Sequence, residues 1–186
     1  MFNIFKKWKQ NFYNKRQETY RQYICELSQK NENILIGNFS FKGFESIFEY
    51  LIANADFEII IFVNNYDSIF NKLNFILFEQ VVKKFEKNKK TIKIYTYYGK
   101  KDKEFIELAK KYKCVTYIPL NLVDNCKATN MILVDRKGYW LEESFTAMCR
   151  YTMDENNKFK ACANFCDAKT VRKLKEFIWD IDEQLR

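Results

Sequence analysis

The sequence has 186 residues, of which 47% are hydrophobic and 18% aromatic, enough apolar material for one well-buried core but not for two. One proline and four glycines exclude a long disordered linker, so we expect a chain that is ordered nearly from end to end. Because the sequence contains no histidine, any catalytic triad or general base built on an imidazole is also excluded.

The formal net charge of +8 is concentrated in one segment, residues 83–113, which holds twelve lysines and four acidic residues. Such a positive field favours nucleic acid, an anionic membrane surface or an acidic protein partner. The alternative is that the lysines simply occupy the solvent faces of helices in a chain of biased composition. The candidate polyanion-binding residues are Lys83, Lys84, Lys87, Lys89, Lys90, Lys93, Lys100 and Lys101.

The apolar runs are too short for a membrane-spanning helix, which needs roughly 18 consecutive apolar residues. Lysines at positions 6, 7 and 9 interrupt any signal-peptide pattern, so we expect a cytoplasmic protein. The six cysteines are scattered singly, which predicts free thiols, and a nucleophilic Cys126 or Cys149 lacks a visible base. Cys162 and Cys166 form a C-x3-C pair, but without a histidine or a second pair we expect no metal and no cofactor.

The pattern over residues 2–28 predicts a basic, aromatic, amphipathic helix. Phe2, Phe5, Trp8 and Phe12 recur at spacings of three and four, with lysines between them. We therefore interpret residues 1–32 as a helical extension. The favoured role is packing on its own domain or a dimer contact, and the alternatives are a membrane interface or the groove of a partner protein.

From residue 34 onward the apolar pattern alternates between strand and helix. The predicted strands are 34–38, 59–63, 92–98 and 114–120, and the predicted helices are 44–55, 67–88 and 103–112. Three successive steps from strand to helix imply right-handed crossovers. We therefore expect residues 33–186 to form an α/β domain with a mostly parallel mixed sheet and helices on both faces.

The pattern changes after residue 120. Two short runs, 129–135 and 139–142, are separated only by Arg136, Lys137 and Gly138, which predicts a hairpin with a positive φ at Gly138. A strand over 159–165 follows. The last helix is marked by Asp167 as its cap and by apolar residues at intervals of three and four, namely Val171, Leu174, Ile178, Ile181 and Leu185.

The segment Ala128-Thr129-Asn130-Met131-Ile132-Leu133-Val134-Asp135 resembles the H-x-K-x4-D motif of the phospholipase D superfamily. The histidine position is Ala128, the lysine position is Asn130, and only Asp135 is kept. The hairpin that follows, the strand ending in Asn164 and the C-terminal helix also suit that family. The resemblance implies a phospholipase D-like domain whose degenerate ligand site contains Thr129, Asn130, Asp135 and Asn164.

The two replacements decide the expected chemistry. In the resembled family an imidazole attacks phosphorus, and an alanine at position 128 can neither attack nor transfer a proton. Loss of the lysine removes the cation that would stabilise the phosphoryl oxygens. We therefore expect no phosphodiesterase activity and no catalytic residues. A second interpretation of Asp135 and Asn164 is structural, with Asp135 satisfying backbone amides at the hairpin entry.

The expected function is that of a non-catalytic phospholipase D-like binding or scaffold module whose partner is nucleic acid. Tyr95, Tyr97 and Tyr98 interleave with the lysines, which suits single strands unless these tyrosines alternate into the core. Single-motif members of the family pair two chains, so the resemblance also implies a homodimer. The alternative function is a membrane-surface or protein-partner adaptor that uses residues 2–12.

Overall fold

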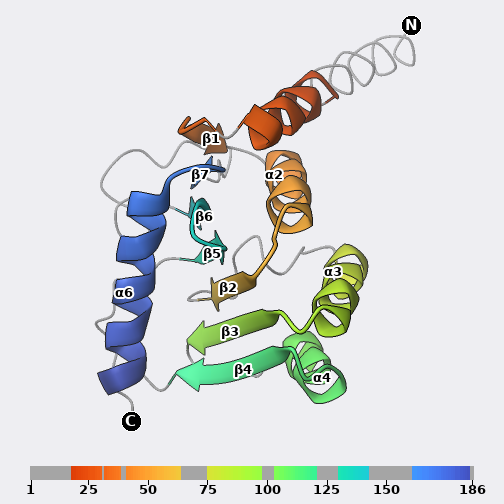
Figure 1. Ribbon diagram of the computed structural model, residues 1–186, viewed down its shortest axis with the longest axis vertical. Coiled ribbons are helices and arrows are strands. Elements are labelled where there is room, and N and C mark those ends of the chain that lie inside the picture. The colour runs from red at the N-terminus through yellow and green to blue at the C-terminus, as the bar shows by residue number, and fades with distance from the viewer. Residues whose placement is uncertain are drawn as a thin grey trace, which may run out of the picture.

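The computed structural model describes residues 18–30, 32–38, 41–63, 75–97, 103–120, 130–142 and 161–184. Its centre is one seven-stranded sheet with the strand order β1-β7-β6-β5-β2-β3-β4 (Figure 1). The strands are β1 (Ile36–Asn38), β2 (Glu58–Val63), β3 (Thr91–Tyr97), β4 (Val115–Leu120), β5 (Met131–Val134), β6 (Gly138–Glu142) and β7 (Ala161–Asn164). The labelled helices are α2 (Phe41–Ala53), α3 (Phe75–Lys87), α4 (Lys103–Lys111) and α6 (Ala168–Gln184).

One half of the sheet is parallel. Strand β2 pairs with β3, and β3 with β4, both in parallel, with α3 and α4 as the connecting helices. Residues 59–63 of β2 are buried without interruption, because helices cover both faces of the sheet at this strand. The alternation of strand and helix expected over residues 34–120 is therefore confirmed.

The other half of the sheet is antiparallel, and this corrects one part of the expected fold. The α/β class, the mixed sheet and the helices on both faces are confirmed, but four of the six strand pairings are antiparallel, so the sheet is not mostly parallel. The hairpin of β5 and β6 adds to the free side of β2, and β7 and β1 continue from it. In the hairpin a three-residue turn joins β5 to β6, and so short a connection runs antiparallel, since parallel pairing needs a long crossover.

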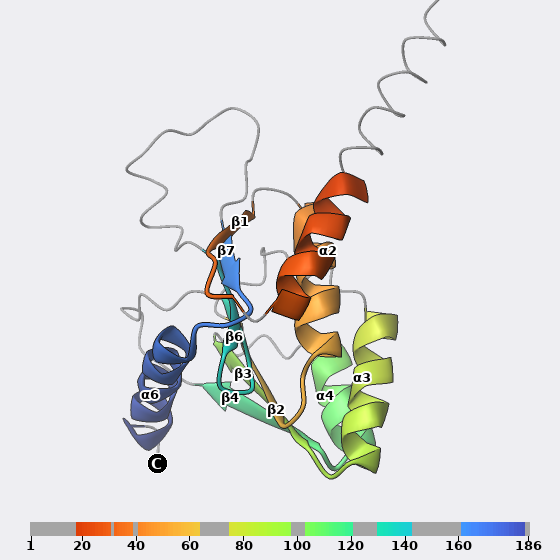
Figure 2. The same ribbon diagram turned by 45° about the horizontal axis from the view of Figure 1, so that its top comes forward.

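The helices form two unequal layers, as Figure 2 shows. Among the helices that the structure describes, the one over residues 18–30, α2, α3 and α4 cover one face of the sheet, and α6 covers the opposite face. The larger core lies under the first layer and contains many aromatic residues, with the Trp140 and Phe44 rings 4.9 Å apart between their centroids. The smaller core lies under α6, where the predicted stripe residues Val171, Ile178 and Ile181 are buried.

The described part of the expected N-terminal extension packs on the α/β core. Ile24 and Leu27 are buried in the larger core, and the Arg21 guanidinium donates to both carboxylate oxygens of Glu49 on α2 at 2.8 and 2.9 Å. Residues 2–12, which carry the predicted amphipathic stripe, lie outside the described residues. The packing interpretation therefore holds for residues 18–30, and the role of the first segment stays a prediction.

The turn between β5 and β6 differs from the expected one in its backbone. The positive φ belongs to Asp135 (53°), and Gly138 is the first residue of β6. Glycine is needed at position 138 for another reason: a Cβ there would lie 2.9 Å from the Cδ1 atom of Leu51 on α2. The expectation of a positive φ at Gly138 was wrong because aspartate also tolerates the left-handed region.

Three further observations bear on the sequence predictions. Cys25, Cys114, Cys162 and Cys166 are free thiols, whereas Cys126 and Cys149 lie outside the described residues. Within the described ranges, no group of three metal-ligating side chains is found. None of the helices described is both long and apolar enough to cross a membrane.

Candidate nucleic-acid interface

The two ends of the parallel strands, which we call the carboxyl edge and the amino edge of the sheet, differ in the polar residues beside them. At the carboxyl edge the parallel strands end, and residue 130 and Glu142 lie beside them at the open end of the β5–β6 hairpin. At the amino edge the parallel strands begin, and the hairpin turn 135–137 lies beside them. Asn130 and Asp135 are thus at opposite ends of β5, so the structure does not bring the predicted ligand residues into one site.

Asn130 is buried at the carboxyl edge and binds a carboxyl group. Its side-chain amide nitrogen donates to Oε2 of Glu142 at 2.5 Å, and the Glu142 backbone nitrogen donates to the Asn130 carbonyl at 3.0 Å. Burial raises the pKa of Glu142, while the hydrogen bond from Asn130 opposes that rise. Sequence reasoning missed Glu142, although a three-residue hairpin turn after Val134 places residue 142 opposite residue 130.

Asp135 has a structural role at the amino edge. Its carboxylate accepts hydrogen bonds from three successive backbone amides, those of Asp56 (2.9 Å), Phe57 (2.7 Å) and Glu58 (3.0 Å). Its own backbone nitrogen donates to the Glu58 carbonyl at 2.8 Å. These four bonds bind the hairpin turn to the loop that precedes β2, and this matches the structural interpretation of Asp135.

Asn164 also serves the fold. It is buried at the end of β7, where its amide nitrogen donates to the Asn33 side chain at 2.7 Å and its oxygen accepts from the Cys166 backbone nitrogen at 2.8 Å. The chain then enters α6 through Asp167, whose carboxylate accepts from the Thr170 amide and hydroxyl at 3.1 and 2.7 Å. These bonds hold the pKa of Asp167 below its usual value and confirm the predicted cap. Thr129 lies outside the described residues.

Five of the eight candidate lysines gather at the amino edge. Lys83, Lys84 and Lys87 occupy the last part of α3, and Lys89 and Lys90 form the turn into β3. The C-terminal end of α4 adds Lys110, Lys111 and Lys113, and the β5–β6 turn adds Arg136 and Lys137. We call these ten residues, together with the loop 53–57 among them, the basic edge.

The basic edge carries a clear excess of positive charge. Its four segments, residues 53–57, 79–90, 110–114 and 135–137, hold ten basic and four acidic residues, a net charge of +6. One of the four acidic side chains, Asp135, is buried and engaged by backbone amides. Several lysines also lie at helix C-termini, where a cation favourably meets the negative end of the helix dipole.

Two glutamates of α3 hold the end of α4 in place. Glu79 accepts hydrogen bonds from the Lys111 ammonium (2.6 Å) and the Tyr112 hydroxyl (2.7 Å), which lower its pKa to about 2. Glu86 accepts from the backbone nitrogens of Cys114 (2.7 Å) and Lys113 (3.3 Å). The lysines of both helices are thereby presented side by side.

Of the three remaining candidate lysines, the structure describes Lys93, which is not on this surface. Lys93 points to the opposite face of the sheet, because alternate residues of a strand face opposite sides, and its ammonium lies 3.5 Å from Glu58 Oε1. Lys175 of α6 donates to the other oxygen of Glu58 at 2.5 Å. Lys100 and Lys101 lie outside the described residues.

Of the tyrosines that suggested stacking with bases, Tyr95 is not available for it. Tyr95 is 2% exposed and lies in the smaller core, with its ring 6.4 Å from that of Phe62 between centroids. The stacking interpretation is therefore wrong for Tyr95, because the residue alternates into the core of its strand. The structure does not describe the side chain of Tyr97 or any part of Tyr98.

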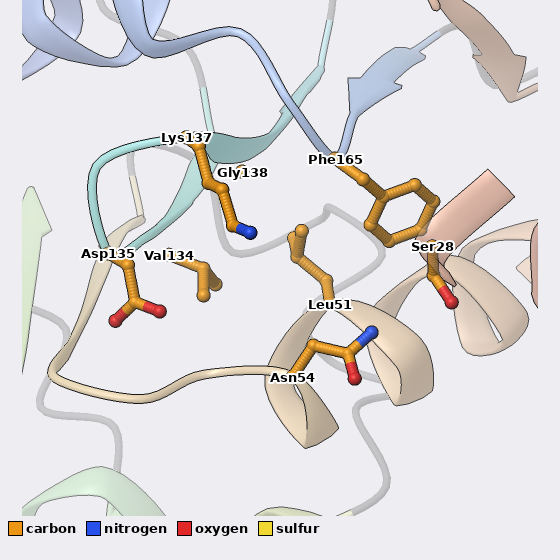
Figure 3. A pocket seen from close by; sticks show the side chains of 8 residues that line it. All are labelled: Ser28, Leu51, Asn54, Val134, Asp135, Lys137, Gly138 and Phe165. Carbon is orange, nitrogen blue, oxygen red and sulfur yellow. The ribbon is translucent and has the colours of Figure 1, made fainter. Parts of the chain in front are cut away.

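A small cavity of about 30 Å³ lies behind the basic edge, between the β5–β6 turn, α2 and the helix over residues 18–30. Figure 3 shows Lys137, Asn54 and Ser28 around it, with Leu51 and Phe165 as apolar walls. This volume suits about one water molecule and is far below that of a small-molecule site. The cavity is therefore no candidate for a cofactor.

Comparisons with known proteins give a fold and no family. No protein-family model matches the sequence, and no curated protein matches it. Among solved structures, TrmBL2, an archaeal chromatin protein with a novel mode of DNA binding, is similar with a TM-score of 0.57 and 15% identity. The match covers 98% of this chain but only 65% of TrmBL2, so the chain spans less than two thirds of that protein.

A second similar structure is Nuc from Salmonella typhimurium, a phospholipase D family member. The TM-score is 0.51 at 17% identity, and the match covers 83% of this chain and 97% of Nuc. The chain therefore has a fold like that of a phospholipase D family member. At these identities the likeness concerns the fold alone.

Proposed function

We propose that this protein is a non-catalytic phospholipase D-like module that binds nucleic acid through the basic edge. The observation that carries the proposal is the convergence of nine lysines and one arginine from three separate segments on the amino edge, where the four segments of the basic edge together have a net charge of +6. A phosphate backbone is the polyanion whose regular charges such a surface fits, and neutralising its phosphates releases counterions.

The kind of side chain present indicates how the contact is made. Nine of the ten basic residues of the edge are lysines, whose flexible ammonium groups act as point charges. Contacts of this kind bind phosphates and read little sequence. The proposed binding is therefore largely independent of sequence and strongly dependent on salt.

The non-catalytic part of the proposal rests on the motif positions. Position 128 is alanine, and position 130 is a buried asparagine engaged with Glu142, so neither supplies a nucleophile or a free cation. The basic edge also lies at the opposite end of β5 from Asn130. Binding and the former catalytic position are thus separate in this proposal.

The fold comparisons are compatible with the proposal. TrmBL2, one of the structures with a similar fold, is a chromatin protein that binds DNA, so this fold is compatible with DNA binding. The homodimer implied by the family resemblance stays a prediction, which sedimentation equilibrium would check.

The first experiment is fluorescence anisotropy of labelled single- and double-stranded DNA and RNA over a series of salt concentrations. We expect affinity to fall steeply with salt. The triple variant Lys87→Gln/Lys89→Gln/Lys110→Gln should bind more weakly, with the salt slope reduced by about 1 for each lysine that contacts a phosphate. These three were chosen because each is exposed.

The matched control removes the same charge elsewhere. Lys42→Gln/Lys103→Gln/Lys173→Gln changes three exposed lysines at the start of α2, the start of α4 and on α6, and should bind almost as the wild type does. Equal losses in both triple variants would contradict the location of the site. A wild-type protein that binds no probe even at low salt would overturn the proposed function.

A separate assay addresses catalysis. The wild-type protein should release no nitrophenol from bis(p-nitrophenyl) phosphate above the buffer rate. Product formation that depends on the protein and is abolished by Asn130→Ala would overturn the non-catalytic assignment.

A further inference from the structure

Phe57 is an exposed aromatic residue at the centre of the basic edge. It lies in the loop between α2 and β2, and 74% of its surface is accessible to solvent. A single exposed apolar side chain is not unusual on a protein surface. What sets Phe57 apart is the combination of its backbone hydrogen bonds and its neighbours.

The backbone of Phe57 is tied on both sides. Its nitrogen donates to Oδ1 of Asp135 at 2.7 Å, and its carbonyl accepts from the Thr91 nitrogen at 3.2 Å. The amides of Asp56 and Glu58 on either side bind the same carboxylate. The loop is thereby fixed between β5 and β3, and the ring is held in solvent by a backbone with little freedom to withdraw it.

Basic residues border this loop on both sides. The sheet order β5-β2-β3 places it between the turn with Arg136 and Lys137 and the turn with Lys89 and Lys90. The Lys90 ammonium lies 3.9 Å from Oδ1 of Asp56, and the Lys84 ammonium donates to the Ala53 carbonyl at 3.3 Å. The exposed ring of Phe57 thus lies in a loop that has basic side chains on both sides.

We infer that Phe57 is a base-stacking residue and that the basic edge prefers single-stranded nucleic acid. This inference rests on the proposed function, because the lysines bind the backbone while the ring binds one unpaired base. Every nucleobase has a π-face, so stacking on a single ring tolerates any sequence. A base paired within a duplex is stacked on both sides and does not offer that face to a side chain.

The test compares Phe57→Ala with Ile76→Ala. Ile76 is a matched control, since it is a large apolar residue that is 77% exposed but lies in the first turn of α3, away from the lysine turn. For labelled oligothymidine we expect Phe57→Ala to weaken binding about 10-fold and Phe57→Tyr to retain most of the affinity. Both alanine variants should bind duplex DNA with the same affinity as the wild-type protein.

A direct signal for stacking comes from Phe57→Trp. In the double variant Trp179→Phe/Phe57→Trp, oligothymidine should quench the tryptophan fluorescence more strongly than it does in Trp179→Phe alone. Trp179 is replaced because it is 53% exposed and would add its own signal.

The possible failures are distinguishable. Salt-dependent binding that is unchanged by Phe57→Ala, or reduced equally for single strands and duplex, would overturn the inference while leaving the basic edge in place. Absent binding of the wild type to every probe would overturn the proposed function itself. Urea unfolding of Phe57→Ala checks that the variant keeps the stability of the wild type.

Discussion

Asp135 and Phe57 are 78 residues apart in the sequence, yet the carboxylate of Asp135 accepts the backbone N–H of Phe57 at 2.7 Å. The same carboxylate serves the two neighbouring amides, so a single side chain orders the loop that precedes β2. Asp135, the residue on which the sequence resemblance to the phospholipase D motif depends, is thus a support for the amino edge. It connects the stability of the sheet with the surface proposed to bind nucleic acid.

Replacing Asp135 should destabilise the protein. Asp135→Ala leaves three backbone amides without their acceptor, and we expect a loss of about 3 kcal/mol in the free energy of unfolding. Asp135→Asn keeps an oxygen acceptor and tolerates the positive φ, so its loss should be smaller, about 1 kcal/mol. Urea unfolding measures both, and Asp180→Ala, an exposed change on α6, is the control. Losses of the same small size in all three variants would contradict the role of Asp135.

The strands and helices could be predicted because each has one dominant environment. The continuous apolar run over residues 59–63 is buried on both faces, and the stripe with Val171 and Ile178 faces a single core. The cap at Asp167 could also be predicted, because it depends only on contacts within the first turn of the helix. Strand pairing could not be predicted from the sequence, since the pairing of β1 with β7 depends on contacts between residues more than a hundred positions apart.

The candidate site was only partly predictable. A cluster of lysines near the end of a helix stays together in space, so half of the basic residues of the basic edge, those between positions 83 and 90, were predicted from the sequence. The prediction failed for Lys93, because the alternation of side chains along β3 turns it toward α6. Tyr95 is buried on that face for the same reason. The exposure of Phe57 could not be predicted, since the sequence alone does not show whether a phenylalanine in a loop is buried or exposed. That depends on how the loop is placed on the rest of the fold.

Glu79 should make stability depend on pH. Its pKa falls from 4.5 to about 2 through the hydrogen bonds from Lys111 and Tyr112, so the folded state binds its proton less readily than the unfolded state does. Its contribution is therefore present above about pH 5 and is lost as the pH falls toward about pH 2. Glu79→Gln should be less stable than the wild type at neutral pH, and the difference should shrink on acidification. Urea unfolding at several pH values would show this, and a constant difference would argue against it.

Glu142 should act in the opposite direction. Burial raises its pKa above 4.5, so the folded state favours the protonated carboxyl group. Its favourable contribution is present below about pH 4.5 and is lost as the pH rises through the raised pKa. Glutamine at position 142 is neutral at every pH, so the stability of Glu142→Gln relative to the wild type should increase as the pH is raised from acidic to mildly alkaline. Urea unfolding measures the difference in the free energy of unfolding between the two proteins. A difference that stays constant over this pH range would refute the assignment.

Gly138 and Leu51 should be energetically coupled. Gly138→Ala restricts the unfolded chain, which alone would stabilise the protein, but the new Cβ would lie 2.9 Å from Leu51 Cδ1 in the buried wall seen in Figure 3. Because overpacking outweighs the gain in a filled core, we expect a net loss of about 1 kcal/mol.

Leu51→Ala should cost about 3 kcal/mol alone, yet the double variant should lose less than the sum, by about 1 kcal/mol, since the added methyl group enters the space that Leu51 leaves. Gly138→Ala combined with Val171→Ala should be additive and serves as the control cycle, because Val171 belongs to α6 and packs in the smaller core on the other face of the sheet. If both cycles were additive, close contact with Leu51 would not be the reason for glycine at position 138.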